Sequence, residues 1–215
     1  MIIGITGSVG SGKSTVSRLF RKKGAVRFDA DRLAREAIEP GRAPYRALVG
    51  VFGKGILREN GTVNRRKLAQ IVFKNPRRVK ILNRLIHPYV IRRMKQEMRG
   101  ISRRRCKPCI VVEVPLLHEA RLAGMFNRVI TVSCSSAGQK ARWVKRGGRL
   151  SDLNERKACQ LPLSYKKKHS DFIIDNSGRL QNTKSQVDRI WQAVVCRKER
   201  KREEKKWMNK KTSHS

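Results

Sequence analysis

The segment GSVGSGKS, residues 7–14, constrains the fold of this chain more than any other part of it. It fits the pattern G-x-x-x-x-G-K-[ST] without a mismatch, and it lies between a short apolar run, MIIGIT, and a helix-like stretch, KSTVSRLFRKKG. In such a strand–loop–helix unit, glycines let backbone N–H groups turn toward phosphate, and the helix N-terminus adds positive potential. The segment therefore predicts a phosphate-binding loop that holds a nucleotide.

The residue types within this loop indicate how ATP is held. Lys13 is placed to bridge the β- and γ-phosphates as a point charge, and the Ser14 hydroxyl is placed to ligate Mg²⁺. We expect the ATP contacts of the loop to come from Gly10, Ser11, Gly12, Lys13, Ser14 and Thr15. ATP and Mg²⁺ are thus the predicted cofactors.

The rest of the chain alternates short apolar runs with helical patterns. Strands are expected within residues 1–6, 25–30, 109–117, 127–134 and 171–178, whereas residues 44–100 lose strand character and contain helix-like stretches. This alternation predicts an α/β fold of the P-loop NTPase type, with a parallel sheet of about five strands covered by helices on both faces. Residues 44–100 would then be a helical insertion in that fold.

The chain is strongly basic. It has 52 Lys and Arg against 16 Asp and Glu, a formal net charge of +36, which favours an anionic partner such as nucleic acid, a membrane surface or a phosphorylated metabolite. A basic surface without any such role is the alternative, and composition does not separate the two. No paired aromatic stacking motif or helix-turn-helix pattern is seen, so we expect no specific nucleic acid as a partner. The charge-dense tail, residues 196–215, is expected to be disordered.

The cysteines and the apolar runs bear on location. Five cysteines without framework spacing argue against a secreted disulfide scaffold, and the pair in CKPC, Cys106 and Cys109, has no second pair to complete a zinc site. The apolar N-terminal run is too short for a signal peptide, and no long apolar stretch follows. These features predict a cytoplasmic protein without a membrane partner.

A phosphate loop alone does not identify the acceptor. The length of the chain excludes most motor ATPases, and no NKxD-type stretch is present to read guanine, so a small-molecule kinase is the favoured class. The segment FDADRLAR follows the second strand and places Asp29 and Asp31 beside the loop. A carboxylate there can orient an attacking hydroxyl or accept its proton, and Asp31 can equally cap the following helix.

Six segments in this order and spacing resemble dephospho-coenzyme A kinase: GITGSVGSGKST, FDADRLAR, NRRKLAQIVF, LNRLIHPYV, VPLLHE and DFIIDNSG. The resemblance extends from residue 1 to about residue 195. It implies transfer of the ATP γ-phosphate to the ribose 3′-hydroxyl of dephospho-CoA, the last step of CoA biosynthesis, by a monomer or a weak homo-oligomer. Other small P-loop kinases, acting on a nucleoside monophosphate or a shikimate-like acceptor, and a basic nucleic-acid-binding P-loop protein are the alternatives.

The resemblance also implies roles on the acceptor side. Asp31 would be the catalytic base or hydroxyl-orienting group, and Asp29 would lie nearer the metal, through water. His87 and Arg65 would contact the acceptor from the helical insertion, which becomes an acceptor-binding lobe at about residues 44–100.

The resemblance further implies a lid at about residues 139–160. Arg142 and Arg146 are four residues apart, so a continuous helix would carry both on one face to clamp the transferring phosphate. Asn176 and Gly178 would lie near the adenine. The chain departs from the family pattern in two places: Glu113 stands where the family usually has Asp, and Gly147-Gly148 follows Arg146 where Arg-Asp is common.

Overall fold

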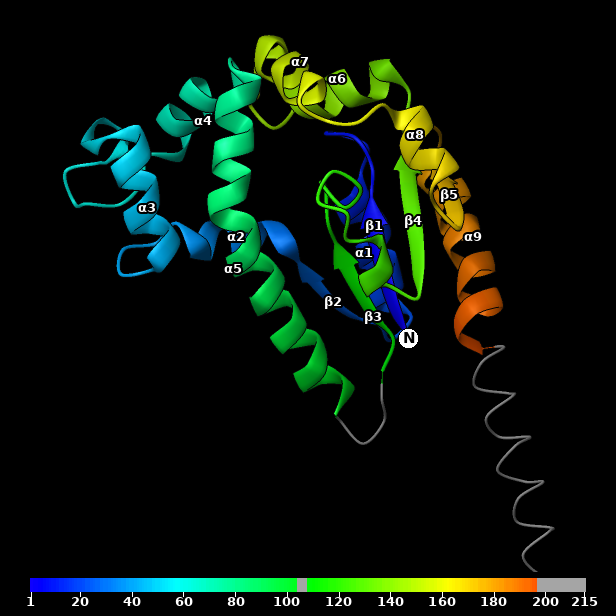
Figure 1. Ribbon diagram of the computed structural model, residues 1–215. Coiled ribbons are helices and arrows are strands. Elements are labelled where there is room, and N and C mark those ends of the chain that lie inside the picture. The colour runs from blue at the N-terminus through cyan, green and yellow to red at the C-terminus, as the bar shows by residue number, and fades with distance from the viewer. Residues whose placement is uncertain (104–107, 197–215) are drawn as a thin grey trace, which may run out of the picture.

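The computed structural model describes residues 1–103 and 108–196, and five parallel strands form its central sheet (Figure 1). The strand order is β2-β3-β1-β4-β5. The bounds are Ile2–Thr6 for β1, Val26–Asp29 for β2, Ile110–Glu113 for β3, Arg128–Ser133 for β4 and Phe172–Asp175 for β5. Each strand lies within a predicted segment, so the predicted parallel α/β sheet is confirmed.

Helices connect these strands and cover the sheet. Those in the first half of the chain are α1 (Lys13–Lys22), α2 (Ala30–Ala37), α3 (Ala43–Phe52), η1 (Lys54–Ile56), α4 (Arg65–Phe73) and α5 (Pro76–Ser102). Those in the second half are η2 (Ala123–Met125), α6 (Ser136–Val144), α7 (Leu150–Ala158), α8 (Leu163–Lys168), α9 (Leu180–Trp191) and the π-helical turn Gln192–Cys196. Within the described residues, no helix combines the length and the apolar character needed to span a bilayer.

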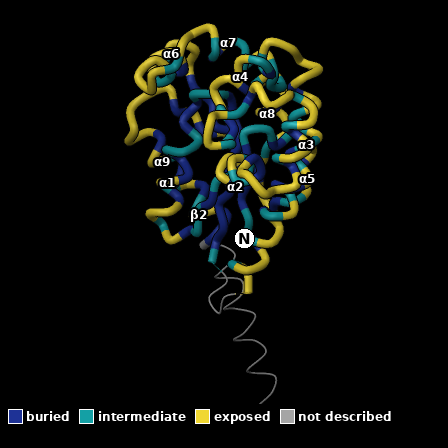
Figure 2. Tube along the Cα trace, turned by 90° about the vertical axis from the view of Figure 1, so that its left-hand side faces the viewer, coloured by how far each residue is buried: buried dark blue, intermediate teal, exposed yellow. Residues whose placement is uncertain are grey.

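The sheet separates two apolar cores, which Figure 2 shows as the buried interior of the molecule. Alternate residues of β1, Ile3 and Ile5, face α1 and α9, where Phe20 and Val187 are fully buried. The opposite face packs against α2 and α5 through residues such as Leu33 and Met94. Since both faces are covered, the strands read as nearly continuous apolar runs.

The helical insertion is built on the long helix α5. Asn75 caps its first turn by accepting the Arg77 N–H, and Pro76 occupies the first helical position, where its missing N–H costs nothing. The helix-like stretches expected in this region are confirmed as α4 and α5. The insertion lies to one side of the sheet beside α2, so it can form one wall of a site at the sheet edge (Figure 1).

Two local expectations were wrong, and both concern helix ends. Asp29, not Asp31, caps α2, because its Oδ1 accepts the Asp31 N–H at 2.9 Å while Asp31 already lies inside the helix. Helix α6 ends at Val144, so Arg142 and Arg146 do not share one helical face. Gly147, at φ +75°, makes the turn that stops this helix.

Some expectations concern residues outside the described part of the chain. They are Cys106, which is one of the two cysteines of the CKPC pair, and residues 197–215. Cys109 lies within the described part and is buried at the start of β3.

Candidate active site

The phosphate loop joins β1 to α1 at the carboxyl end of the sheet. Gly12 has φ +92°, and a Cβ at this position would lie 1.9 Å from Asn176 Nδ2, so neither the backbone nor the space permits a larger residue. The same Asn176 Nδ2 donates to the Ser11 carbonyl at 2.9 Å, and its Oδ1 accepts from Thr183 Oγ1 at 3.0 Å. The loop is therefore held from β5 and α9 as well as by its own glycines.

Lys13 is turned back onto the first half of the loop. Its Nζ donates to the carbonyls of Gly7 and Ser8, both at 3.0 Å. Burial lowers the pKa of Lys13 to about 8, against an opposing contribution from the negative charge of Asp31. The Lys13 ammonium is thus poorly solvated, at the place where a bound phosphate would take the position of water.

Ser14 is tied to a buried carboxylate at the end of β3. Its Oγ donates to Glu113 Oε2 at 2.8 Å, and Glu113 is only 3% exposed. The other oxygen of Glu113 accepts from Arg27 Nε at 2.7 Å and from the Ser17 hydroxyl. Glu113 is therefore a fully engaged partner of the loop rather than a free acid.

Mg²⁺ fits the oxygen donors at this end of the sheet. Ser14 supplies a hydroxyl, with Glu113 behind it, and Asp29 pairs with Glu113 in the register of β2 and β3. Residues 1–103 and 108–196 contain no group of three or more His, Cys, Asp or Glu side chains able to hold a metal. A donor set this small suits Mg²⁺, which usually takes few protein ligands and completes its shell with water and substrate phosphate.

Asp31 lies on the acceptor side of the loop, on the wall of two pockets. Desolvation raises the pKa of this carboxyl, the charge of Asp29 raises it further, and Lys13 and Arg35 act in the opposite direction. Its carboxyl makes no hydrogen bond to the described residues. Asp31 is thus an available acceptor whose pKa is raised by desolvation, with the charges of Lys13 and Arg35 opposing that rise only in part.

The larger pocket has a volume of about 540 Å³ and lies between α2, α4, α5 and α7. It brings together Asp31 and Arg65, as the sequence predicted for the acceptor side. It also contains Arg35, Arg66 and Arg156, which sequence reasoning missed. Several guanidinium groups around one cavity fit an acceptor that carries phosphates.

Arg156 enters this pocket from α7. Its guanidinium lies 4.4 Å from the ring centroid of Phe73 and 5.6 Å from that of Trp143. The sequence held one signal for it: Arg156 follows the buried Leu153 by three residues, so both lie on the inward face of α7. Phe73 comes from far along the chain and Trp143 from the preceding helix α6, and neither contact carried such a signal.

The smaller pocket, about 160 Å³, extends from Asp31 toward His87 and is mostly apolar. Ala34, Val90 and Leu116 are among its walls. Desolvation lowers the pKa of His87, so its imidazole is neutral at pH 7. The imidazole of His87 makes no hydrogen bond to the described residues, which leaves its ring nitrogens available to a ligand.

The two arginines predicted for the lid have different surroundings. Arg142 donates to the Asn176 carbonyl at 2.7 Å and to the Ser11 carbonyl at 3.3 Å, so it already rests on the phosphate loop. Arg146 is exposed beyond the end of α6, and its side chain makes no hydrogen bond or ion pair to the described residues. Gly178 follows Asn176 in the loop after β5, close to Asn182 of α9.

Comparisons with known proteins identify the family of this chain. The family model described as dephospho-CoA kinase matches residues 1–182. The dephospho-CoA kinase of Shouchella clausii is 38% identical over 193 residues, covering 87% of this chain and 95% of the relative. That of Halalkalibacterium halodurans is 39% identical over 189 residues, covering 87% and 93%.

Solved structures extend the likeness to three dimensions. The Thermus thermophilus protein TT1252 is 32% identical with a TM-score of 0.73, covering 92% of this chain and 97% of that one. The dephospho-CoA kinase from Campylobacter jejuni is 22% identical with a TM-score of 0.64, covering 90% and 96%, and shows a shared fold. With a family match over residues 1–182 and relatives at 38–39% identity over most of its length, this chain belongs to the dephospho-CoA kinase family.

Proposed function

We propose that this chain transfers the γ-phosphate of ATP to the ribose 3′-hydroxyl of dephospho-CoA, giving CoA and ADP. The observation that carries the proposal is the position of Asp31. This carboxylate lies on both acceptor pockets and is close enough to Lys13 for each to shift the pKa of the other. A hydroxyl bound beside Asp31 would thus face a phosphate bound at the loop.

The donor side holds ATP through the loop backbone, with Lys13 at the β- and γ-phosphates and Asn176 and Gly178 near the adenine. Ser14 would hold Mg²⁺, with Asp29 reaching it through water, and Glu113 fixes the Ser14 hydroxyl in place. Bound Mg²⁺ would neutralise charge on the phosphate oxygens. When ATP binds, Lys13 must leave the Gly7 and Ser8 carbonyls and turn toward the γ-phosphate.

Asp31 orients the 3′-hydroxyl of the acceptor and takes its proton as the new P–O bond forms. The acceptor phosphates lie in the larger pocket against Arg65, Arg35 and Arg156, whose charges match them. The neutral His87 donates or accepts one hydrogen bond in the smaller pocket. Positioning and charge neutralisation supply most of the acceleration, since phosphoryl transfer asks for little covalent chemistry.

Arg142 and Arg146 act on the transferring phosphate when the lid closes. Arg142 is already at the loop, and a bound phosphate offers it stronger acceptors than the neutral carbonyls it now contacts. Arg146, on the turn ahead of α7, arrives from solvent. The two arginines thus approach from different elements.

The purified full-length protein tests this proposal with ATP, Mg²⁺ and dephospho-CoA. We expect the parent to form CoA, and Asp31→Asn to lose that activity while it binds ATP as the parent does. Asp188→Asn is the matched control, because it removes only a surface ion pair with Lys23 and should leave activity unchanged. A parent that does not phosphorylate dephospho-CoA, or an Asp31→Asn variant of full activity, would contradict the proposal.

A further inference from the structure

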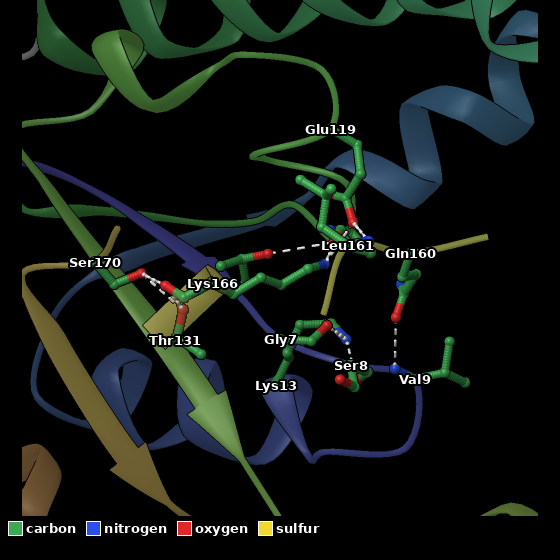
Figure 3. A network of polar contacts seen from close by, with 12 residues as sticks. Gly7, Ser8, Val9, Lys13, Glu119, Thr131, Gln160, Leu161, Lys166 and Ser170 are labelled. Carbon is green, nitrogen blue, oxygen red and sulfur yellow. Dashed lines mark hydrogen bonds and ion pairs between the residues drawn. The ribbon is translucent and has the colours of Figure 1, made fainter. Parts of the chain in front are cut away.

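A chain of polar contacts lies next to the phosphate loop, and its residues Gln160, Glu119 and Lys166 have no role in the phosphoryl transfer described above. It runs through the segment that leaves the lid, residues 159–166, which follows α7 and includes the first residues of α8. Figure 3 shows the segment above the loop, with Gln160 over Val9 and the Lys166 side chain reaching toward Glu119. The question is what this segment does for the loop.

Gln160 makes the direct connection. Its Oε1 accepts the backbone N–H of Val9 at 3.2 Å across 151 residues of sequence. Because the Val9 N–H can only donate, the carboxamide must present its oxygen to the loop and not its nitrogen. Val9 follows Gly7 and Ser8, the two residues whose carbonyls hold Lys13, so the contact bears on the half of the loop that positions this lysine.

The other end of the segment is anchored in the protein interior. The Lys166 side chain is fully buried, and its Nζ lies 2.8 Å from Glu119 Oε1 and 3.1 Å from the Pro115 carbonyl. Glu119 Oε1 also accepts the Leu161 N–H at 2.9 Å. The residue after Gln160 is thus fixed by the same carboxylate that pairs with Lys166.

The sheet holds this anchor in turn. The Lys166 carbonyl accepts from the Thr131 hydroxyl of β4 at 3.1 Å and from Ser170 at 2.8 Å. Thr6, the last residue of β1, donates to the same Pro115 carbonyl as Lys166. The anchor is therefore tied to the last residue of β1, where the phosphate loop begins, to the segment just after β3 and to Thr131 within β4.

We propose that Gln160 is a positioning residue for phosphoryl transfer, which connects the exit of the lid to the phosphate loop while Glu119 and Lys166 fix the exit segment. This inference rests on the proposed function. Gln160 lies two residues beyond the last residue of α7, so movement of α7 over the acceptor pocket is coupled to the loop through this side chain. The loop and the lid therefore reach the positions needed for phosphoryl transfer together, and misalignment of the two lowers the rate of the chemical step.

Two substitutions of Gln160 separate hydrogen bonding from packing. Gln160→Leu keeps the size of the side chain and removes the acceptor, whereas Gln160→Glu keeps an acceptor for the Val9 N–H. Gln181→Leu is the matched control, because Gln181 is exposed on α9 and the change of residue type is identical. Gln160 is only partly buried, so we expect all three variants to fold, with thermal unfolding as the check.

Hydrogen–deuterium exchange of the peptide covering residues 7–14, without nucleotide, is the first readout. We expect exchange to rise roughly three- to tenfold in Gln160→Leu and to stay at the parent rate in Gln160→Glu and Gln181→Leu. Equal exchange in the Leu and Glu variants would overturn the proposal. This measurement does not depend on catalysis, so it stands apart from a failure of the proposed function.

Steady-state kinetics are the second readout. We expect Gln160→Leu to lower kcat about tenfold with a much smaller change in KM for ATP, because the loop keeps its phosphate-binding N–H groups. A purely structural role would lower the unfolding temperature and leave kcat per folded molecule unchanged. A kcat within about twofold of the parent, with normal folding, would contradict the positioning role.

Discussion

The two sides of the active site differ in how their polar side chains are held. On the phosphate-loop side, Lys13, Ser14 and Asn176 each bond to other parts of the protein before any substrate is bound. On the acceptor side, Asp31, Arg65 and His87 line pockets and make no side-chain hydrogen bond to the described residues. The donor side is thus preorganised by the chain, whereas the acceptor side leaves its hydrogen-bonding capacity to the substrate.

This difference predicts how variants on the two sides will fail. A group held by several protein partners contributes to the free energy of unfolding, and its removal leaves those partners unsatisfied. A group that waits for a ligand contributes mainly to the affinity for that ligand. Substitutions on the phosphate-loop side should therefore lower the free energy of unfolding, whereas substitutions on the acceptor side should lower the affinity for the acceptor.

The largest effect is expected for Glu113→Ala on the donor side. The substitution leaves Arg27 without its carboxylate and the Ser14 hydroxyl without its acceptor, and it removes one of the two acceptors of Ser17, so we expect the free energy of unfolding to fall by about 3–5 kcal/mol. Denaturant unfolding measures it, with the exposed Glu59→Ala as the control. A loss below about 1 kcal/mol would mean that the donor side is not held as described.

Arg65→Ala tests the acceptor side and should have an intermediate effect. Arg65 is exposed at the first position of α4, so we expect no measurable change in stability or in KM for ATP. Losing one charged contact to an acceptor phosphate should raise KM for dephospho-CoA about ten- to a hundredfold, equivalent to about 1.5–3 kcal/mol. An unchanged acceptor KM would remove Arg65 from the site.

The smallest effect is the pH dependence contributed by His87. Desolvation lowers its folded pKa below the ordinary value of 6.5, so the unfolded chain takes up the proton first as the pH falls. Stability from the neutral imidazole is therefore present above pH 6.5 and is lost as the pH falls from there through the folded pKa. We expect His87→Gln to flatten this part of the unfolding profile, and an unchanged profile would show that His87 is more solvated than its pocket suggests.

The sequence was most informative where function and fold depend on neighbouring residues. The phosphate loop, the five strands and the helices after β1, β2, β4 and β5 followed from local spacing and apolar patterns. Asp29 and Asp31 could be placed beside the loop in the same way, but their division of labour could not. Which of two nearby acids caps a helix depends on where the first turn begins, a difference of two residues.

Contacts between distant segments escaped prediction for a different reason. Gln160 reaches Val9, and Arg156 reaches Phe73, only after the whole chain has folded. The predicted pairing of Arg142 with Arg146 was wrong because it assumed that the helix continued past Val144. Glycine at positive φ ended that helix, and a helical pattern alone does not reveal such a stop.

The register of the sheet fixes the distance between the proposed binding sites of the two substrates. Glu113 pairs with Ile5 of β1 on one side and with Asp29 of β2 on the other, so β3 is the one strand between the start of the phosphate loop and the start of α2. Two strand spacings, roughly 10 Å, separate the backbones from which donor and acceptor are held. Backbone hydrogen bonds set this span, and side-chain substitutions do not alter it. Changes in the helical insertion can therefore alter which acceptor is bound while the distance across which phosphate is passed stays the same.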